Sequence, residues 1–174
     1  MSACQSKQMG VEMTVSEIMV KMLESAGGNF HDINHLMKVY TYAKTIAECE
    51  QVTEKERKTV EIAAIVHDIA CPLCREKYGN ADGGLQEKES APLVEEFLKG
   101  AGLSEEMLNR IVYIVSHHHT PQAADGIDFQ ILLEADYLVN ADESGFSEAN
   151  IRNTMEQMFQ TDTGKKLLKS IYGL

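Results

Sequence analysis

The side chains of this chain that are best suited to chemistry are two histidines and two aspartates on the apolar faces of predicted helices. They are His35, His67, Asp68 and Asp136. A single histidine in a core is more often simply hydrogen-bonded, but four converging buried ionisable groups need a countercharge. Imidazoles and carboxylates together suit a divalent ion in the range of Mn, Fe, Co, Ni or Zn. The sequence therefore predicts a site for a divalent metal ion, with Mg also left open.

The segment 60–68 supplies two of these side chains, and the rest of the chain is organised around it. Its apolar residues recur at helical spacing, so that His67 lies on the buried face and Asp68 on its flank. A bare carboxylate on that side of a helix is costly, whereas a shared cation would compensate it. His35 and Asp136 lie on the apolar faces of two other helical segments. All four side chains are therefore expected to point inward.

A run of three histidines ends the helix predicted from Glu105 to about His118. Helical spacing places His118 on the buried face, His119 beside it and His117 nearer to solvent. The alternative interpretation is a helix end whose dipole favours partly protonated imidazoles. We expect a functional role for His118, leave His119 open between the two interpretations, and favour the alternative for His117.

Helical signals extend along the chain and define an all-α fold. Thr14 with Glu17 and Thr53 with Glu56 form capping boxes, and Asp128 is expected to cap a later helix. Pro72 is expected to break the central helix and to open an irregular connection over residues 71–85. The predicted helices cover about residues 14–27, 32–50, 53–68, 86–99, 105–118, 128–142, 147–159 and 164–171.

These elements predict one compact domain over residues 1–174, a length sufficient for a substantial core. Its core is expected at about 30–142. The N-terminal helix 14–27 and the C-terminal helices 147–172 should pack on that core, the latter covering the pocket.

The composition argues against several classes of partner. The net charge is −11, with 27 acidic and 16 basic residues, so a nucleic-acid polymer is not expected as a partner. No apolar run approaches the roughly 20 residues that span a membrane, and residues 1–9 lack the apolar stretch of a signal peptide. These features predict a cytoplasmic protein with no membrane partner and with free thiols. The oligomeric state is left open.

Two weaker signals follow the central helix. Cys71 and Cys74 form a C-x-x-C pair, which can bind zinc or take part in redox exchange. Without a second cysteine pair or a β-α-β context, an ordinary structural role is favoured and a redox-sensitive role stays open. Lys77, Tyr78 and Lys88 could contact a substrate phosphate, although exposed loop positions are the default interpretation.

Three motifs of this chain resemble those of the HD-domain metal-dependent phosphohydrolase superfamily. Residues 35–43 look like its opening "H-x-x-K/R-V-x-x-Y-A" motif, residues 63–69 like its "A-A-x-L-H-D-I" signature, and residues 131–138 like its closing "L-x-x-A-D-x-L" segment. The resemblance covers about residues 30–140. It implies an all-helical core and metal ligands at His35, His67, Asp68 and Asp136.

The resemblance also implies hydrolysis of a phosphate ester on a nucleotide or another small phosphorylated molecule. Many members carry one or two histidines at the place of His118 and His119, where they bind a second metal or the substrate phosphate. Residues 69–72 lack the Glu-Asp pair of the guanosine-tetraphosphate hydrolases. Glutamates at 87 and 89 stand where the cyclic-dinucleotide branch has a further histidine. The His-Thr pair at 119–120 and the Ala-Asp pair at 135–136 resemble motifs of the bacterial diadenosine-tetraphosphate hydrolases.

The expected mechanism uses a metal-activated water as the nucleophile. Asp68, or an unligated carboxylate such as Glu87, would accept the proton, and His118 and His119 would neutralise charge on the phosphoryl oxygens. The alternative is a non-catalytic metal or nucleotide sensor with the same pocket.

Overall fold

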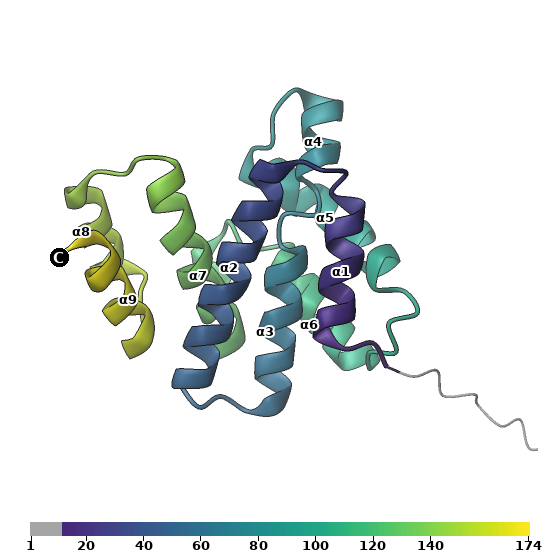
Figure 1. Cartoon of the computed structure of the whole chain (residues 1–174), viewed down its shortest axis with the longest axis horizontal. Helices are drawn as coiled ribbons and strands as arrows, with labels where there is room; N and C mark the ends of the chain where they lie inside the picture. The colour runs from purple at the N-terminus through teal and green to yellow at the C-terminus, as the bar shows by residue number, and fades with distance from the viewer. Residues whose placement is uncertain (1–11) are drawn as a thin grey trace, which may run out of the picture.

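The computed structural model describes residues 12–174, and throughout this range the regular structure is helical (Figure 1). The polar segment 1–9, on which the expectation of no signal peptide rests, lies outside the described residues. The elements are α1 (Val15–Ser25), α2 (Phe30–Cys49), α3 (Glu54–Val66), α4 (Cys71–Tyr78), α5 (Gly83–Leu98), α6 (Glu105–Val115), the short 3-10 helix η1 (Pro121–Ala123), α7 (Ile127–Glu143), α8 (Glu148–Gln157) and α9 (Asp162–Tyr172). The predicted all-α fold is confirmed.

Helix α3 lies at the centre of the bundle, in contact with α1, α2, α6 and α7. Its second half, from Thr59 to Val66, is completely buried, and so is His67 directly after it. A helix covered on all sides is mostly apolar around its circumference, and this segment is apolar except for Thr59 and for Glu61, whose carboxylate accepts hydrogen bonds from Tyr40 and Arg57. The chain therefore leaves α3 inside the protein, and His67 and Asp68 follow where the backbone begins to turn.

The helix termini show how closely local sequence signals fix the elements. Both predicted capping boxes form, because Thr14 and Thr53 each accept a hydrogen bond from the backbone N–H three residues on. Ser147 caps α8 in a similar way. After α1 the chain turns through Gly27 and Gly28, whose φ angles of 59° and 82° lie in the left-handed region.

The predicted irregular stretch over residues 71–85 is wrong for most of its length. Helix α4 occupies its first half, with Pro72 in the first helical turn. Proline is well tolerated there, because the N–H groups of the first turn have no partner inside the helix. Helix α5 then begins at Gly83, three residues before the predicted start.

Two further helix ends differ from the prediction. Helix α6 ends at Val115, so the three histidines follow it in a turn. Helix α7 has Gly126 at its N-cap instead of Asp128. Asp128 is buried in the first turn, and its carboxylate accepts hydrogen bonds of 2.6 and 2.9 Å from Arg110. Asp128 therefore pairs with Arg110 on α6, although the sequence had indicated that it would cap α7.

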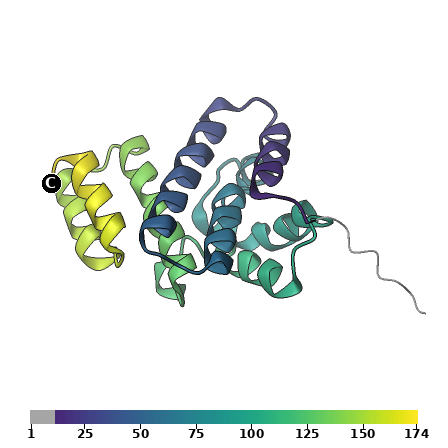
Figure 2. The same cartoon turned by 60° about the horizontal axis from the view of Figure 1, so that its bottom comes forward.

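The C-terminal helices do not cover the pocket, contrary to the prediction. Helix α9 contacts α7, α2 and α8, and both α8 and α9 lie at the end of the molecule away from α1, α4 and α5 (Figures 1 and 2). The main cavity is lined by residues 21–97. No helix in the described range has the length and hydropathy needed to cross a bilayer.

One buried carboxylate attaches these C-terminal helices to the core. Glu134 on α7 is fully buried and accepts hydrogen bonds from the Gln130 side chain (2.7 Å) and from the backbone N–H groups of Gln160 (2.6 Å) and Thr161 (3.0 Å). The Thr161 hydroxyl also donates to it, at 2.5 Å. A Cβ at Gly164 would lie 1.9 Å from its Oε2 atom. The start of α9 is therefore built around the Glu134 side chain.

We expect Glu134→Ala to lower the free energy of unfolding by about 2 kcal/mol, because it leaves several buried donors without an acceptor. Urea denaturation followed by circular dichroism measures this change. Glu148→Ala is the matched control, since its exposed ion pair with Arg152 is worth at most about 0.5 kcal/mol. Equal effects of the two substitutions would show that Glu134 does not fasten α9.

Candidate metal centre

The structure brings the four predicted ligands together at the end of α3. His35 comes from α2, Asp136 from α7, and His67 and Asp68 from the chain just after α3. The Nε2 atoms of His35 and His67 are 3.1 Å apart. Asp136 Oδ1 lies 3.2 Å from His35 Nε2 and 3.6 Å from His67 Nε2. Asp68 Oδ2 lies 3.5 Å from both nitrogens.

The other ring nitrogen of each imidazole is held by an acceptor. His67 Nδ1 lies 2.9 Å from the Ala64 carbonyl, and His118 Nδ1 lies 2.7 Å from the Val115 carbonyl. His35 Nδ1 lies 2.9 Å from the carboxylate of Glu143. A carbonyl or an ionised carboxylate can only accept, so each Nδ1 carries a proton and donates it. In the neutral rings the Nε2 lone pairs therefore point into the cluster.

This arrangement fits a cation. Nitrogen lone pairs and carboxylate oxygens repel one another unless a positive charge lies between them. The Nε2 atom of His118 shows the same need: it is buried without a hydrogen-bond partner, 3.6 Å from Asp68 Oδ1. Nitrogen and oxygen donors of this kind suit a first-row divalent ion. His35, His67, Asp68 and Asp136 would hold it, with His118 at the edge.

The ionisation of the cluster supports the same interpretation. Burial opposes a charge on His35, but the hydrogen bond to Asp136 and the charge of Asp68 raise the pKa of His35 to about 9. Burial also acts against ionisation of Asp68 and Asp136, yet the neighbouring imidazoles hold the pKa of both carboxyls well below the usual range. Both carboxylates therefore stay charged at neutral pH and stabilise a positive charge beside them, and a bound metal ion would replace the proton that they favour on His35 Nε2.

Asp68 belongs to two groups of side chains with metal-ligand spacing. It joins His35 and His67 in one group, and His118 and His119 in the other. Its carboxylate thus lies between the central cluster and the histidine run. His118 is buried, whereas His119 is exposed and packs its ring at 3.9 Å from that of His118. His119 also lies against Gly83, where a Cβ would come within 2.5 Å of its ring.

His117 faces away from this cluster. It is half-buried, its Nδ1 lies 2.7 Å from the Tyr113 carbonyl, and its ring packs 4.5 Å from the Tyr113 ring. His117 and His118 therefore have different surroundings, as helical spacing had indicated, although both lie in the turn after α6. His118 faces the predicted metal ligands, and His117 packs on the outside of α6.

The structure does not bring Glu87 to the metal ligands. Its carboxylate accepts hydrogen bonds from the backbone N–H of His119 (3.1 Å) and from the Thr120 hydroxyl (3.2 Å). Glu87 therefore stabilises the turn that presents the histidines. Because both of its oxygens are engaged there, the geometry gives it a positioning role in place of the predicted role as a base.

The three predicted phosphate contacts also lie elsewhere. Lys77 and Tyr78 both donate to the carboxylate of Glu89, at 2.9 and 2.6 Å. Lys88 is exposed on α5. None of these residues lines the main cavity. Their positions match the alternative interpretation, in which they are ordinary surface residues.

The two cysteines of the C-x-x-C pair are buried free thiols on α4. Burial, with the nearby charge of Asp68, raises the pKa of Cys71 well above its ordinary value. A protonated thiol is a poor metal ligand and a poor nucleophile. Within the described part of the chain, neither cysteine joins a group with metal-ligand spacing.

Two residues near the cluster, Glu143 and Asp32, were not predicted from the sequence. Glu143 lies seven residues after Asp136, and that spacing on one helical face could have identified it. Asp32 accepts hydrogen bonds of 2.6 and 2.9 Å from Arg75 and lines the cavity. Its partner comes from α4, which the sequence did not predict as a helix, so no sequence signal pointed to this pair.

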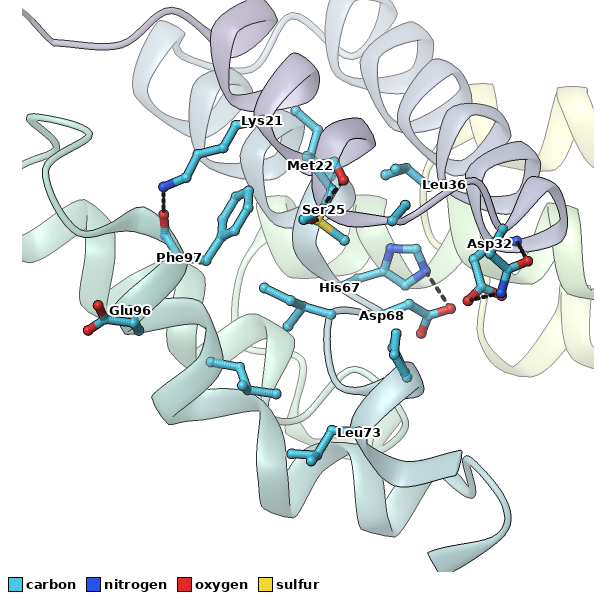
Figure 3. Close-up of a pocket in the computed structure, with 16 residues that line it drawn as sticks. Lys21, Met22, Ser25, Asp32, Leu36, His67, Asp68, Leu73, Glu96 and Phe97 are labelled. Atoms are coloured by element: carbon cyan, nitrogen blue, oxygen red, sulfur yellow. Dashed lines mark hydrogen bonds and ion pairs between the residues drawn. The ribbon is translucent and has the colours of Figure 1, made fainter. Parts of the chain in front are cut away.

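A cavity of about 570 Å³ opens beside the cluster (Figure 3). His67 and Asp68 form part of its wall, so it adjoins the metal centre. Helix α1 forms one side of the cavity, and α4 and α5 form the opposite side. Most of its remaining lining is apolar: Met22, Ala26, Leu36, Ile65, Ile69, Pro72, Leu73, Leu93 and Phe97.

We expect Glu143→Gln to weaken metal binding about tenfold, because Glu143 orients His35 and increases its basicity through Nδ1. Isothermal titration with Mn²⁺ or Zn²⁺ measures the affinity. Lys38→Gln is the control, since Lys38 binds the other oxygen of Glu143 at 2.9 Å and is itself exposed. An unchanged affinity in Glu143→Gln would contradict the assigned orientation of His35.

Comparison with known proteins agrees with this geometry. The family model of the HD domain matches residues 32–142, and the chain therefore belongs to the HD domain family. A predicted HD superfamily hydrolase from an uncultured Thermotogales bacterium has a similar fold, with a TM-score of 0.65 and 24% identity over 91% of this chain and 84% of that chain. No curated protein matches the sequence.

Proposed function

We propose that the protein is a metal-dependent phosphohydrolase that acts on a nucleotide or another small phosphate ester. One observation carries the proposal: imidazole lone pairs and ionised carboxylates converge at the wall of a cavity large enough for a small molecule. Asp68 lies in that wall and also joins both ligand groups. Membership of the HD domain family supports the same chemistry.

The residues of the site have different chemical roles because their surroundings differ. His35, His67, Asp68 and Asp136 would hold a divalent ion, which would supply an activated water as the nucleophile. Asp68 reaches the cavity wall with one side of its carboxylate, and we assign it the role of proton acceptor there. His118 presents a lone pair at Nε2 and would bind a cation more readily than a phosphoryl oxygen. His119, at the exposed edge, is left to contact the phosphoryl group.

The test is a screen of the metal-reconstituted protein against nucleotides and small phosphate esters. Release of inorganic phosphate indicates a monoesterase, and release of a mononucleotide indicates cleavage of a phosphodiester or phosphoanhydride. Mn, Fe, Co, Ni, Mg and Zn are tested in turn. Tight binding of one of these ions without turnover of any substrate would favour the non-catalytic sensor. A small phosphorylated partner and a cytoplasmic setting are parts of the same proposal.

A further inference from the structure

We propose that the cavity beside the metal centre binds the organic part of the substrate, and that this part is apolar and carries a single phosphate. The inference rests on the proposed function and narrows it. The substrate class becomes the monophosphate esters of apolar alcohols, in place of polyphosphates and dinucleotides.

The first support is that the cavity adjoins the metal centre through His67 and Asp68. Asp68 and His67 lie in the wall of the cavity between Asp32 on one side and Phe97 and Glu96 on the other (Figure 3). A phosphate held beside Asp68 would therefore direct its ester group into the cavity. The volume of about 570 Å³ is within the usual range of about 300–1,000 Å³ for small-molecule sites.

The second support is the chemistry of the walls. Met22 on α1 lies on one side, and Leu73 on α4 and Leu93 and Phe97 on α5 lie on the other. Ile69 adds an apolar side chain directly after Asp68. Apolar walls gain free energy by removing an apolar group from water. The uncharged polar side chains of the lining, Ser25 and Asn29, already donate to the Met22 carbonyl and to Asp32, so they are poorly placed to bind a sugar or a second phosphate.

The third support is the shortage of positive charge. Among the described residues that line the cavity, Lys21 supplies the basic side chain, and its ammonium donates to the Phe97 carbonyl and lies 4.5 Å from the centre of the Phe97 ring. Glu96 and Asp32 add negative charge, although Arg75 binds Asp32. Polyphosphates are normally held by several Arg or Lys side chains. A second phosphate in this cavity would therefore be repelled.

Binding and turnover of a homologous series test the inference. The metal-loaded full-length protein is titrated calorimetrically with n-alkyl phosphonates from methyl to hexyl, and turnover is measured with the matching alkyl phosphates. We expect affinity to rise about three- to fourfold per methylene. Inorganic triphosphate should bind more weakly than hexylphosphonate. Equal affinity along the series, or tighter binding of triphosphate, would overturn the inference.

The two outcomes of the assay separate this inference from the proposed function. A rising affinity without turnover of any ester refutes the phosphohydrolase and keeps the cavity as an apolar binding site. Turnover that is independent of chain length keeps the phosphohydrolase and refutes the role of the cavity.

Variants locate the effect in the cavity. Leu93→Asn should reduce the gain in binding affinity per methylene to about twofold or less, because part of the cavity wall becomes polar. Met22→Gln on the opposite wall provides a second, similarly shaped substitution. Val20→Ser is the control: Val20 lies on α1 but outside the cavity and is 55% exposed. Metal content and helical circular dichroism verify that each variant is folded. A full gain per methylene in both cavity variants would refute the assignment.

Discussion

The Asp68→Ala protein is expected to lose its bound divalent ion and to retain less than about a thousandth of the wild-type turnover. Loss of an outer partner of a metal ligand already costs about 10- to 100-fold, and Asp68 belongs to both groups of candidate ligands. The carboxylate is also the candidate proton acceptor at the cavity wall. Metal analysis of the purified protein and a phosphate-release assay measure the two losses together.

The fold should survive this substitution. Asp68 follows α3 and is not part of the apolar core, so the helical circular-dichroism signal should remain. Asp162→Ala is the control, because Asp162 is an exposed aspartate in the first turn of α9 and should leave metal content and turnover unchanged. Wild-type protein that takes up no divalent ion, or an Asp68→Ala protein with full metal content, would contradict the metal site.

The His118→Ala protein is expected to lose about a hundredfold in turnover, equivalent to about 2.7 kcal/mol of transition-state stabilisation. The Nε2 atom of His118 is buried without a partner and lies 3.6 Å from Asp68 Oδ1. This nitrogen therefore makes no hydrogen bond within the protein that would explain why it is buried there. Single-turnover kinetics with a saturating divalent ion separate this effect from a change in substrate binding.

His117→Ala is the matched control, since His117 is adjacent in sequence but packs against Tyr113. It should change turnover less than twofold, well within the spread of surface substitutions of about 0.5 kcal/mol. Metal stoichiometry adds a second readout: a His118→Ala protein that loses one of two ions identifies His118 as a ligand of the second ion. Equal losses in the two variants would contradict the orientation of the histidine run.

The sequence was sufficient to place the candidate metal ligands because each of them lies among the apolar residues of one helical segment. The position of His67 and Asp68 could be predicted because the apolar segment 62–66 at the end of α3 leads directly into them. His118 could be placed because the residue three positions before it, Val115, is also buried. In each case the local pattern and the packing agree, and such agreement makes a prediction from sequence reliable.

The remaining features depend on contacts between distant segments. Pro72 carries the same local signal whether it ends one helix or begins the next, and packing of α4 against α5 decides between them. Glu87 accepts hydrogen bonds from residues 119 and 120, which lie more than 30 positions later in the sequence. The cavity arises only when α1 lies opposite α4 and α5. No periodicity within a single helix could reveal these relationships.

The buried carboxylate of Glu134 also determines how the molecule opens. Glu134 accepts hydrogen bonds from the backbone of Gln160 and Thr161, which connect α8 to α9. Gln130 donates both to Glu134 and to the Met158 carbonyl at the end of α8, so releasing either helix disturbs the attachment of both. Native-state hydrogen exchange should therefore detect α8 and α9 as one cooperative unit, with an opening free energy below that of global unfolding. Helices α2 and α3 stay protected during this opening, so His35 and His67 keep their places while the C-terminal end of the protein is exposed.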